Sequence, residues 1–369
     1  MIPLVDLQAA HVEVAEEVAV GFKRILANTA FIGGEEVAAF EREYAAFCGL
    51  PHCVGVANGT DALELALRAA GVGPGDEVIV PANTFIATAE AVARAGASVA
   101  LVDADPDTYL IDVDAALTAV TPATRAVVPV HLYGQLAPVE ELRAALPPEV
   151  VIVEDAAQCQ GATRHGRPAG FEGIASTSFY PGKNLGAYGD AGAVVSASAE
   201  VATAVRRLGS HGGLTKYIHD VIGVNSRLDG LQAVVLRAKL ARLAAWNEAR
   251  RAAAARYDAL LADVDVVRPV TLDGNAHVWH LYVVRVPGDG TPSRRDAVVS
   301  ALNAAGVGAG IHYPVPVHLT PAFADVARRA GSLAHSEAAA HEILSLPVYP
   351  QITADQQAQV VEALRAALA

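Results

Sequence analysis

Short apolar runs alternate with helical segments between residues 77 and 155, and this alternation constrains the fold more than any other feature. The runs are continuous, without interleaved polar residues, as in strands that are covered on both faces. This β-α-β order is typical of an α/β protein with a mostly parallel sheet. The expected strands are 78–80, 98–102, 126–130 and 151–153, and the helices between them are 84–95, 112–119 and 138–145.

The order of elements changes near residue 228, where a long helical pattern is followed by a mixture of strands and helices. Such a change indicates a separate α+β unit. We expect a large α/β domain over 1–245 and a smaller C-terminal α+β domain over 246–369, with the N-terminal helix free to pack on the smaller one. The other expected elements are helices at 10–28, 34–48, 62–70, 228–261, 294–305 and 354–368, and strands at 264–267 and 277–286.

The composition excludes several classes of protein. The 369 residues are 53% hydrophobic and 18% charged, as in a compact globular protein with a large core. A net charge of −13 argues against nucleic-acid binding, although it leaves an anionic small substrate open. Three cysteines without a CxxC pair predict neither a zinc site nor a disulfide framework, and a reducing cytoplasm is expected. We expect no signal peptide and no membrane helix, because the longest uncharged stretch, 297–324, is broken by glycine and proline.

Lys183 and Asp155 are the residues best suited to chemistry. Lys183 lies in a Gly/Pro-rich turn, 179–186, so its amine can reach into a pocket. Asp155 follows an apolar strand, at the sheet edge where α/β proteins bind ligands. Singly, a lysine in a turn is usually a solvated charge and an aspartate after a strand is usually a helix N-cap. Together they suit pyridoxal phosphate: the lysine forms a Schiff base with the aldehyde, and the acid keeps the ring nitrogen protonated.

These segments also carry a resemblance to a known family. The runs 153–158, 178–186 and 189–193 resemble the DegT/DnrJ/StrS family of fold-type I, pyridoxal-phosphate-dependent nucleotide-sugar aminotransferases. Around the lysine, the chain is most similar to the members that aminate 3-keto-6-deoxyhexoses. Further matching runs follow in order along nearly the whole chain: 58–63, 81–85, 131–135, 225–229 and 311–314.

The resemblance implies which residues would contact the cofactor. Lys183 and Asp155 become the catalytic pair. Gly59 and Thr60 open a helix whose N-terminus would hold the phosphate, although the sequence alone favours ordinary helix capping by Asn58 or Thr60. Phe85 would lie flat on the pyridine ring, with a place in the core as the rival interpretation.

Three more residues complete the implied cofactor site. Gln158 would bond the phenolic oxygen, unless it is a helix-surface amide. Ser178 would be a second phosphate donor. Asn225 lies in a loop that in similar proteins reaches the neighbouring subunit's phosphate, which implies a homodimer with shared active sites; a capping loop for the long helix is compatible with this role.

The substrate contacts are predicted from polar loops. A nucleotide sugar brings a diphosphate, and Lys216 with Tyr217 would clamp it, unless the lysine is simply solvated. His312 and Tyr313 lie in a Gly/Pro-rich segment that suits a pocket wall, although a histidine in a loop often has no such role. The remaining predicted substrate contacts are Tyr180, Tyr188 and Arg227.

The resemblance implies transamination in two halves. L-glutamate gives its amine to the cofactor, and a dTDP-linked 3-keto-6-deoxyhexose receives it, making an amino sugar for antibiotic or polysaccharide biosynthesis. The resemblance implies amination at C3, and Gly182 and Gly186 would leave room for a sugar that enters turned by one carbon. The alternatives are a 4-keto sugar or cyclitol aminotransferase, a sugar dehydratase, and a non-enzymatic cofactor-binding regulator. Lys183 speaks against the dehydratase, because those members have histidine at its position.

Overall fold

The computed structural model describes all 369 residues, and its centre is an eight-stranded mixed sheet. The strand order is β1-β9-β8-β5-β4-β2-β3-β12; neighbours from β8 to β12 run parallel, whereas β9 is antiparallel to both β1 and β8. The expected mostly parallel α/β architecture is therefore confirmed. The strands are β1 (His52–Val56), β2 (Glu77–Pro81), β3 (Ser98–Val102), β4 (Thr124–Val127), β5 (Val151–Asp155), β8 (Ile174–Ser178), β9 (Gly192–Ser196) and β12 (Arg328–Arg329).

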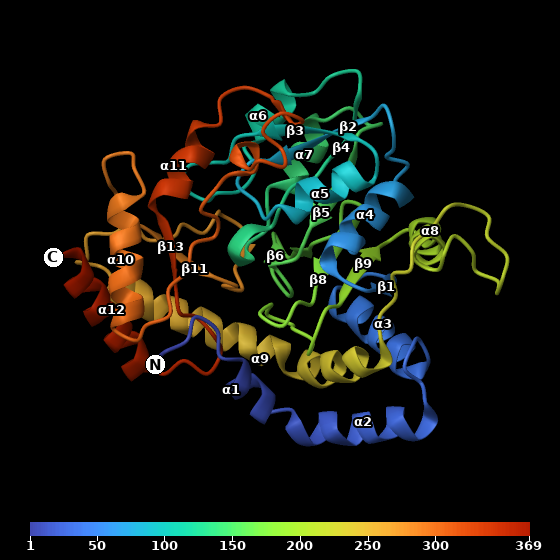
Figure 1. The fold of residues 1–369 in the computed structure, drawn as a ribbon, viewed down its shortest axis with the longest axis horizontal. Coiled ribbons are helices and arrows are strands. Elements are labelled where there is room, and N and C mark those ends of the chain that lie inside the picture. The colour runs from blue at the N-terminus through green and yellow to red at the C-terminus, as the bar shows by residue number, and fades with distance from the viewer.

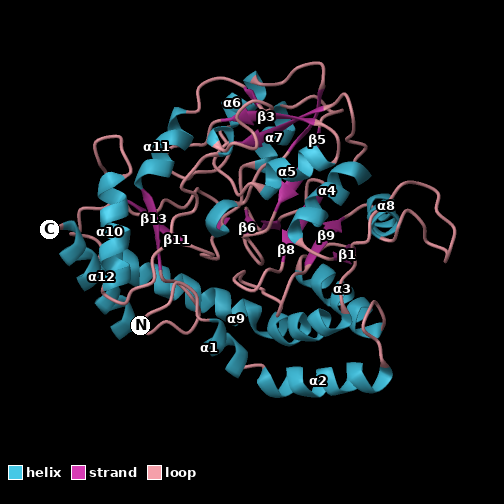
Figure 2. Cartoon of the chain, viewed as in Figure 1, coloured by secondary structure: helices cyan, strands magenta, loops and turns pink.

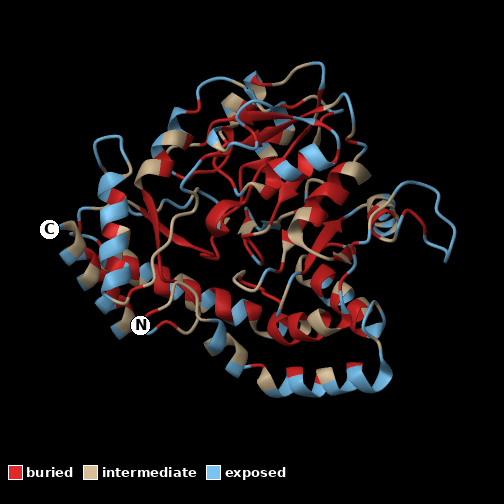
Figure 3. Cartoon of the chain, viewed as in Figure 1, coloured by how far each residue is buried: buried red, intermediate tan, exposed pale blue.

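Strand β2 shows why the apolar runs are continuous. Its Val78 and Val80 belong to one buried cluster, whereas Ile79 between them belongs to another on the opposite face. Helices cover both faces, so every position of the strand is buried (Figures 2 and 3). The first face is covered by α4 (Gly59–Ala69), α5 (Ala87–Arg94) and α8 (Ala199–Gly209), and the second by α6 (Val113–Thr118) and α7 (Val139–Ala145).

A 31-residue helix, α9 (Gly230–Leu260), connects the sheet to the C-terminal unit. Figure 1 shows it running beneath the sheet toward both chain termini. Its N-terminal half packs against α2 (Ala15–Asn28) and α3 (Glu35–Phe47), and its C-terminal half contributes Tyr257 to the core of the C-terminal unit. The proposed domain boundary near residue 245 falls inside this helix. That unit contains the antiparallel pair β11 (Tyr282–Arg285) and β13 (Ile343–Leu346), with α10 (Ser293–Ala304), α11 (Ala334–Glu342) and α12 (Ala354–Leu368).

The first residues of the chain join the C-terminal unit. Ile2 is buried in that unit's core, and its backbone bonds Gly306 and Gly308, each at 2.8 Å. The helix that follows, α1 (Leu7–Val12), has no buried residue. Short elements complete the structure: a three-stranded sheet of β6 (Thr163–Arg164), β7 (Arg167–Pro168) and β10 (Asn275–Ala276), and the 3-10 helices η1 (Leu132–Gly134) and η2 (Val317–Leu319). None of the helices combines the length and apolar character needed to cross a membrane.

Three expected elements differ in the structure. The helix expected over 10–28 is divided at Val14 into α1 and α2. Of the strand expected over 277–286, only β11 (Tyr282–Arg285) forms. Trp279 has a φ of 49°, and the N–H of Val278 before it donates to the Gly134 carbonyl. The strand expected over 264–267 is reduced to a single bridge from Val267 to Arg285.

Candidate active site

One cavity of about 830 Å³ lies where β2, β5 and β8 end. Parallel strands of an α/β sheet bring their carboxyl ends to one edge, so residues far apart in sequence meet there. The cavity is lined by Leu4, Val5, Asn58, Gly59, Thr60, Leu63, Thr84, Phe85, Ala87, Glu90, Arg94, Val130, Asp155, Ala157, Gln158, Ser178, Tyr180, Gly182, Lys183, Asp190, His280, Leu281, His312 and Tyr313.

The turn that carries Lys183 is tightly held. Lys183 N–H donates to the Tyr180 carbonyl at 2.8 Å, and the Lys239 ammonium donates to the Gly186 carbonyl at 2.6 Å. A Cβ at Gly186 would lie 2.2 Å from the Pro181 oxygen, so only glycine fits there. The expectation that Gly186 leaves room for substrate is therefore wrong. Burial lowers the pKa of Lys183 to about 8, and the nearby carboxylate of Asp155 opposes a larger decrease.

Asp155 ends β5 between two neighbouring parallel strands and is almost fully buried. Its carboxylate accepts hydrogen bonds from the Thr88 hydroxyl at 2.8 Å and the Ala157 N–H at 3.1 Å. No arginine or lysine forms an ion pair with it. The carboxylate is thus oriented by neutral donors and has no ion-pair partner among the side chains around it.

The first turn of α4 provides donors for an anion. The Asn58 side chain caps the N–H of Asp61, which leaves the N–H groups of Gly59 and Thr60 without helical partners. Ser178 adjoins them: a Cβ at Gly59 would lie 2.5 Å from the Ser178 Cβ. Because the Ser178 hydroxyl accepts from Tyr180 N–H at 3.2 Å, its own hydrogen remains free to donate.

Aromatic side chains form the wall of the cavity. Phe85 is half exposed, and its ring centroid lies 5.6 Å from that of Tyr313. Gln158 accepts from the Tyr133 N–H at 2.7 Å and donates to the Tyr313 hydroxyl at 3.0 Å. Burial lowers the pKa of His312 to about 4, so its imidazole is neutral at physiological pH.

These groups fit pyridoxal 5′-phosphate. The helix N-terminus and Ser178 offer neutral donors to a phosphate, Phe85 offers a flat face to the ring, and Asp155 offers an anion to the ring nitrogen. Lys183 lines the same cavity, and its lowered pKa makes more of its amine neutral, the form that reacts with an aldehyde.

Ten of the fifteen predicted site residues line this cavity: Gly59, Thr60, Phe85, Asp155, Gln158, Ser178, Tyr180, Lys183, His312 and Tyr313. The other five do not. Tyr188 bonds His11 and lies under the Lys239 ammonium, which is 4.7 Å from its ring centroid. The remaining four, Lys216, Tyr217, Asn225 and Arg227, lie on or next to a loop, 211–223, that projects from the molecule after α8 (Figure 1).

Several lining residues were missed by the sequence analysis. Leu4 and Val5 reach the cavity because the chain's start pairs with the C-terminal unit, which no local pattern indicates. His280 and Leu281 were taken as part of a strand, but the irregular backbone at Trp279 places them in the cavity. The other missed residues with charged side chains are Glu90, Arg94 and Asp190.

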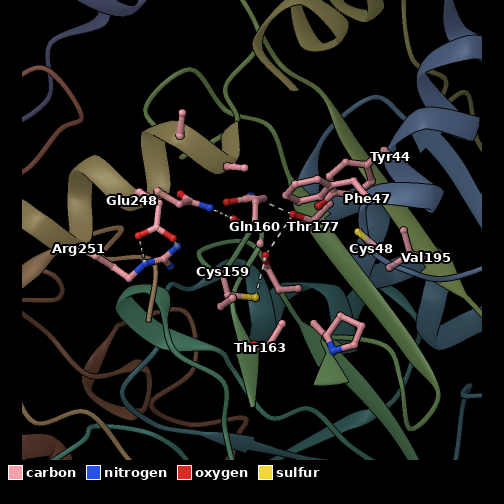
Figure 4. A pocket seen from close by; sticks show the side chains of 18 residues that line it. Tyr44, Phe47, Cys48, Cys159, Gln160, Thr163, Thr177, Val195, Glu248 and Arg251 are labelled. Atoms are coloured by element: carbon pink, nitrogen blue, oxygen red, sulfur yellow. Dashed lines mark hydrogen bonds and ion pairs between the residues drawn. The ribbon is translucent and has the colours of Figure 1, made fainter. Parts of the chain in front are cut away.

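A second cavity, of about 390 Å³, lies behind the loop that follows β5 (Figure 4). Its lining includes Ala156, Cys159 and Gln160, whereas Asp155, Ala157 and Gln158 of the same segment line the first cavity. Burial raises the pKa values of Cys159 and of Cys48, so both thiols are protonated at neutral pH. Gln160 donates to Thr177 at 3.0 Å. This cavity contains no group of His, Cys, Asp or Glu able to hold a metal ion and none of the predicted catalytic residues.

Fold and site together define a fold-type I, pyridoxal-phosphate-dependent aminotransferase. The chain belongs to the DegT/DnrJ/EryC1/StrS aminotransferase family, which matches residues 13–365. Its cofactor is pyridoxal phosphate, as the sequence analysis expected.

Individual relatives are similar over nearly their whole length. The chain is 45% identical over 367 residues to a dTDP-3-amino-3,4,6-trideoxy-alpha-D-glucose transaminase of Streptomyces venezuelae, covering 99% of this chain and 95% of that one. It is 43% identical over 369 residues to a UDP-N-acetyl-3-dehydro-alpha-D-glucosamine 3-aminotransferase of Acidithiobacillus ferrooxidans, and the match covers 100% of this chain and 98% of that one. The crystal structure of S. venezuelae DesV in complex with a ketimine intermediate matches with a TM-score of 0.94 at 45% identity. The match covers 99% of this chain and 98% of that one.

Proposed function

We propose that this aminotransferase transfers the amine of L-glutamate to C3 of a dTDP-linked 3-keto-6-deoxyhexose. The observation that carries the proposal is the meeting of Lys183, Asp155 and an anion-binding helix start in one cavity. The similarity to a dTDP-amino-sugar transaminase supports the substrate class. The relative named for a UDP-linked 3-dehydro sugar supports C3, and the assay below decides between the dTDP and UDP nucleotides.

The chain's own residues divide the work. Gly59, Thr60 and Ser178 would bind the phosphate of the cofactor, and Phe85 would cover one face of its ring. Asp155 would hold a proton at the ring nitrogen. When bound, pyridoxal phosphate supplies an electron sink for the carbon that loses a proton. Gln158, whose amide is already fixed by Tyr133 and Tyr313, would orient the ring.

Lys183 moves the proton. Its Nζ has a pKa of about 8, so a substantial fraction of the free amine is neutral near physiological pH. A neutral amine can take the proton from Cα of glutamate and later return one to the sugar carbon. His280 is held next to Lys183's neighbour Asn184, through an Nδ1···Oδ1 contact of 3.2 Å. Burial lowers the pKa of His280 well below its usual range, so it adds no competing charge.

The charges of the cavity support a homodimer with shared active sites. Arg94 is already paired with Asp61 at 3.1 Å and Glu64 at 2.8 Å. Lys183 is needed for chemistry, so one chain leaves no free cation for a diphosphate or for the carboxylates of glutamate. Lys216 and Arg227 form no ion pair within their own chain and lie on or beside the projecting loop. We propose that they, with Asn225, enter the cavity of a second copy.

The surface of the projecting loop, 211–223, supports the same assembly. Its side chains Tyr217 and Ile222 are 83% and 90% exposed, and Leu214 and Ile218 are more than half exposed. A cluster of large apolar side chains on one segment is typical of an interface. Covering it with a second chain removes this surface from water and delivers the cations at the same time.

The half-reaction with glutamate tests the activity. Purified enzyme mixed with L-glutamate alone is expected to release 2-oxoglutarate and lose the absorbance of the lysine-bound cofactor. A regulator without activity releases none. Lys183→Ala is the matched control and must also release none, while Lys216→Ala is expected to retain this step if its role is to bind the diphosphate.

The second half-reaction tests the sugar. The enzyme is offered dTDP- and UDP-linked 3-keto and 4-keto sugars and a keto cyclitol, and products are assigned by NMR. Nitrogen on C3 of the dTDP-linked 6-deoxyhexose supports the proposal. Nitrogen on C4 refutes the position while leaving the aminotransferase activity intact, and loss of a hydroxyl without nitrogen transfer indicates a dehydratase. We also propose a reducing, cytoplasmic location, because all three cysteines are unpaired.

A further inference from the structure

A chain of hydroxyl groups leads to Asp155. The Thr88 hydroxyl lies 2.8 Å from Oδ2 of Asp155, and the Thr84 hydroxyl lies 2.9 Å from that of Thr88. Thr88 is fully buried, and Thr84 and Asp155 are at least nine-tenths buried. Buried polar groups of this kind act as a unit, because the low local dielectric strengthens each bond.

The carboxylate at one end fixes which hydroxyl donates in each of these hydrogen bonds. An ionised carboxylate can only accept, so the single hydrogen of Thr88 must go to Asp155. Thr88 is then left as the acceptor, and the hydrogen between the two threonines must come from Thr84. The other carboxylate oxygen, Oδ1, is held by the Ala157 N–H at 3.1 Å. Both oxygens are thus fixed by one donor each, and their remaining lone pairs are free to face the cavity.

Thr84 and Thr88 flank Phe85 at the start of α5. The same five residues therefore supply the aromatic side chain that would cover the ring and the hydroxyl that orients the carboxylate. We propose that Thr88 is a positioning residue: it holds the Asp155 carboxylate at the angle that the ring nitrogen of the cofactor requires. This proposal rests on the role proposed above for Asp155.

The test compares two ligands. The affinity of cofactor-free enzyme is measured for pyridoxal phosphate and for its 1-carba analogue, in which C–H replaces the ring nitrogen. Thr88→Val keeps the shape but removes the donor. We expect it to weaken pyridoxal phosphate binding about 10- to 100-fold, the value of a hydrogen bond to a charged group. Binding of the analogue, which makes no bond to Asp155, is expected to change about threefold or less.

Three variants serve as controls. Thr88→Ser restores the hydroxyl and is expected to restore the preference for the ring nitrogen. Thr108→Val removes a similar bond, from Thr108 to Asp105 at 2.7 Å, far from the cavity, and is expected to leave both affinities unchanged. Asp155→Asn is expected to lose the preference completely. If Asp155→Asn still binds pyridoxal phosphate more tightly than the analogue, the role proposed for Asp155 is wrong. If Asp155→Asn loses this preference while Thr88→Val keeps it, only the role proposed for Thr88 is wrong.

Equal weakening of both ligands by Thr88→Val would also overturn the proposal, because it would indicate a general loss of structure. Should this variant not fold, Thr84→Val provides the same comparison from one bond further away. It is expected to weaken only pyridoxal phosphate, by a smaller factor, and an equal effect on both ligands would again contradict the proposal.

Discussion

Burial favours the neutral form of Lys183, and this effect outweighs the nearby carboxylate of Asp155, which favours the charged form. That carboxylate is held by other donors and forms no ion pair with the lysine. A lysine must be neutral to attack a carbonyl group, and burial is the usual way in which proteins achieve this near neutral pH.

We expect the labelling of Lys183 in cofactor-free enzyme to rise with pH around a midpoint of about 8 instead of the ordinary 10.5. Only the neutral amine reacts with an acylating reagent, so the rate follows deprotonation. Mass spectrometry of the Lys183 peptide measures the rate, with exposed Lys23 on α2 as the internal comparison. A midpoint above about 10 would show that burial does not govern this amine.

The sequence identified the residues of the site that belong to local motifs. Lys183, Asp155 and Gly59 each lie in a short run whose chemistry is visible without the fold. Leu4 and His280 were not identified, because their positions depend on long-range backbone paths that periodicity does not report. Asn225 was identified by motif, yet its own chain leaves it outside the cavity.

The turn from Phe179 to Ala187 is the element on which the site depends. Its ends are closed by the bond from Ala187 N–H to the Phe179 carbonyl at 2.8 Å. Asn184 fastens it to the rest of the structure, donating to the Val278 carbonyl at 2.9 Å and to Asn247 of α9 at 3.1 Å. The lysine is therefore placed by a rigid element in spite of its irregular backbone.

We expect Gly186→Ala to lower turnover about 100-fold. The new Cβ would lie 2.2 Å from the Pro181 oxygen, so the turn must shift, and a displacement of about 1 Å is enough for such a loss. Steady-state kinetics measure the effect. Gly73→Ala is the control, because nothing lies within 4 Å of its Cβ. Wild-type turnover in Gly186→Ala would show that the turn is not rigid.

The elements of the large domain were predictable where their strands are rich in Val, Ile and Leu. β3 was predicted over its observed range, as was α12 in the C-terminal unit. β8 and β9 were missed because Ser, Thr, Ala and Gly dominate them, and only their neighbours in the sheet make them strands.

At the scale of the whole molecule, the proposed dimer predicts complementation between inactive variants. A mixture of Lys183→Ala and Asn225→Ala chains, refolded together, is expected to recover about a quarter of wild-type activity. Random pairing makes half of the dimers hybrid, and each hybrid has one site without a lesion. Mixing Lys183→Ala with Asp155→Asn is the control and should recover no activity. One chain supplies both residues to a site, so every site in these hybrids carries a lesion. Activity that persists in a dilute monomer would contradict the shared site.

Three histidines whose pKa values are lowered by burial predict acid sensitivity. Burial lowers the pKa values of His277 to about 3 and His312 to about 4, and that of His280 well below its usual range. Below the unfolded pKa of about 6.5, the unfolded chain therefore binds more protons than the folded one, so stability falls as pH decreases.

We expect the free energy of unfolding, measured with urea, to decrease from about pH 6.5 towards pH 4 by up to about 1.4 kcal/mol per pH unit for each histidine. His277→Gln should flatten this slope, whereas the same change at exposed His165 should not. An unchanged slope in His277→Gln would assign the sensitivity to other groups.

The second cavity has a consequence for heat resistance. Side chains that line a cavity lack some of the dispersion contacts that close packing would supply. Ala244 and Ala245 lie on exposed positions of α9 at its edge, so a longer side chain there can enter it without approaching Lys183. Leucine costs a helix little, and burying part of it adds about 1 kcal/mol, or about 2 °C in melting temperature for a protein of this size. A version of this enzyme adapted to hotter conditions can therefore gain stability through larger side chains at these two positions.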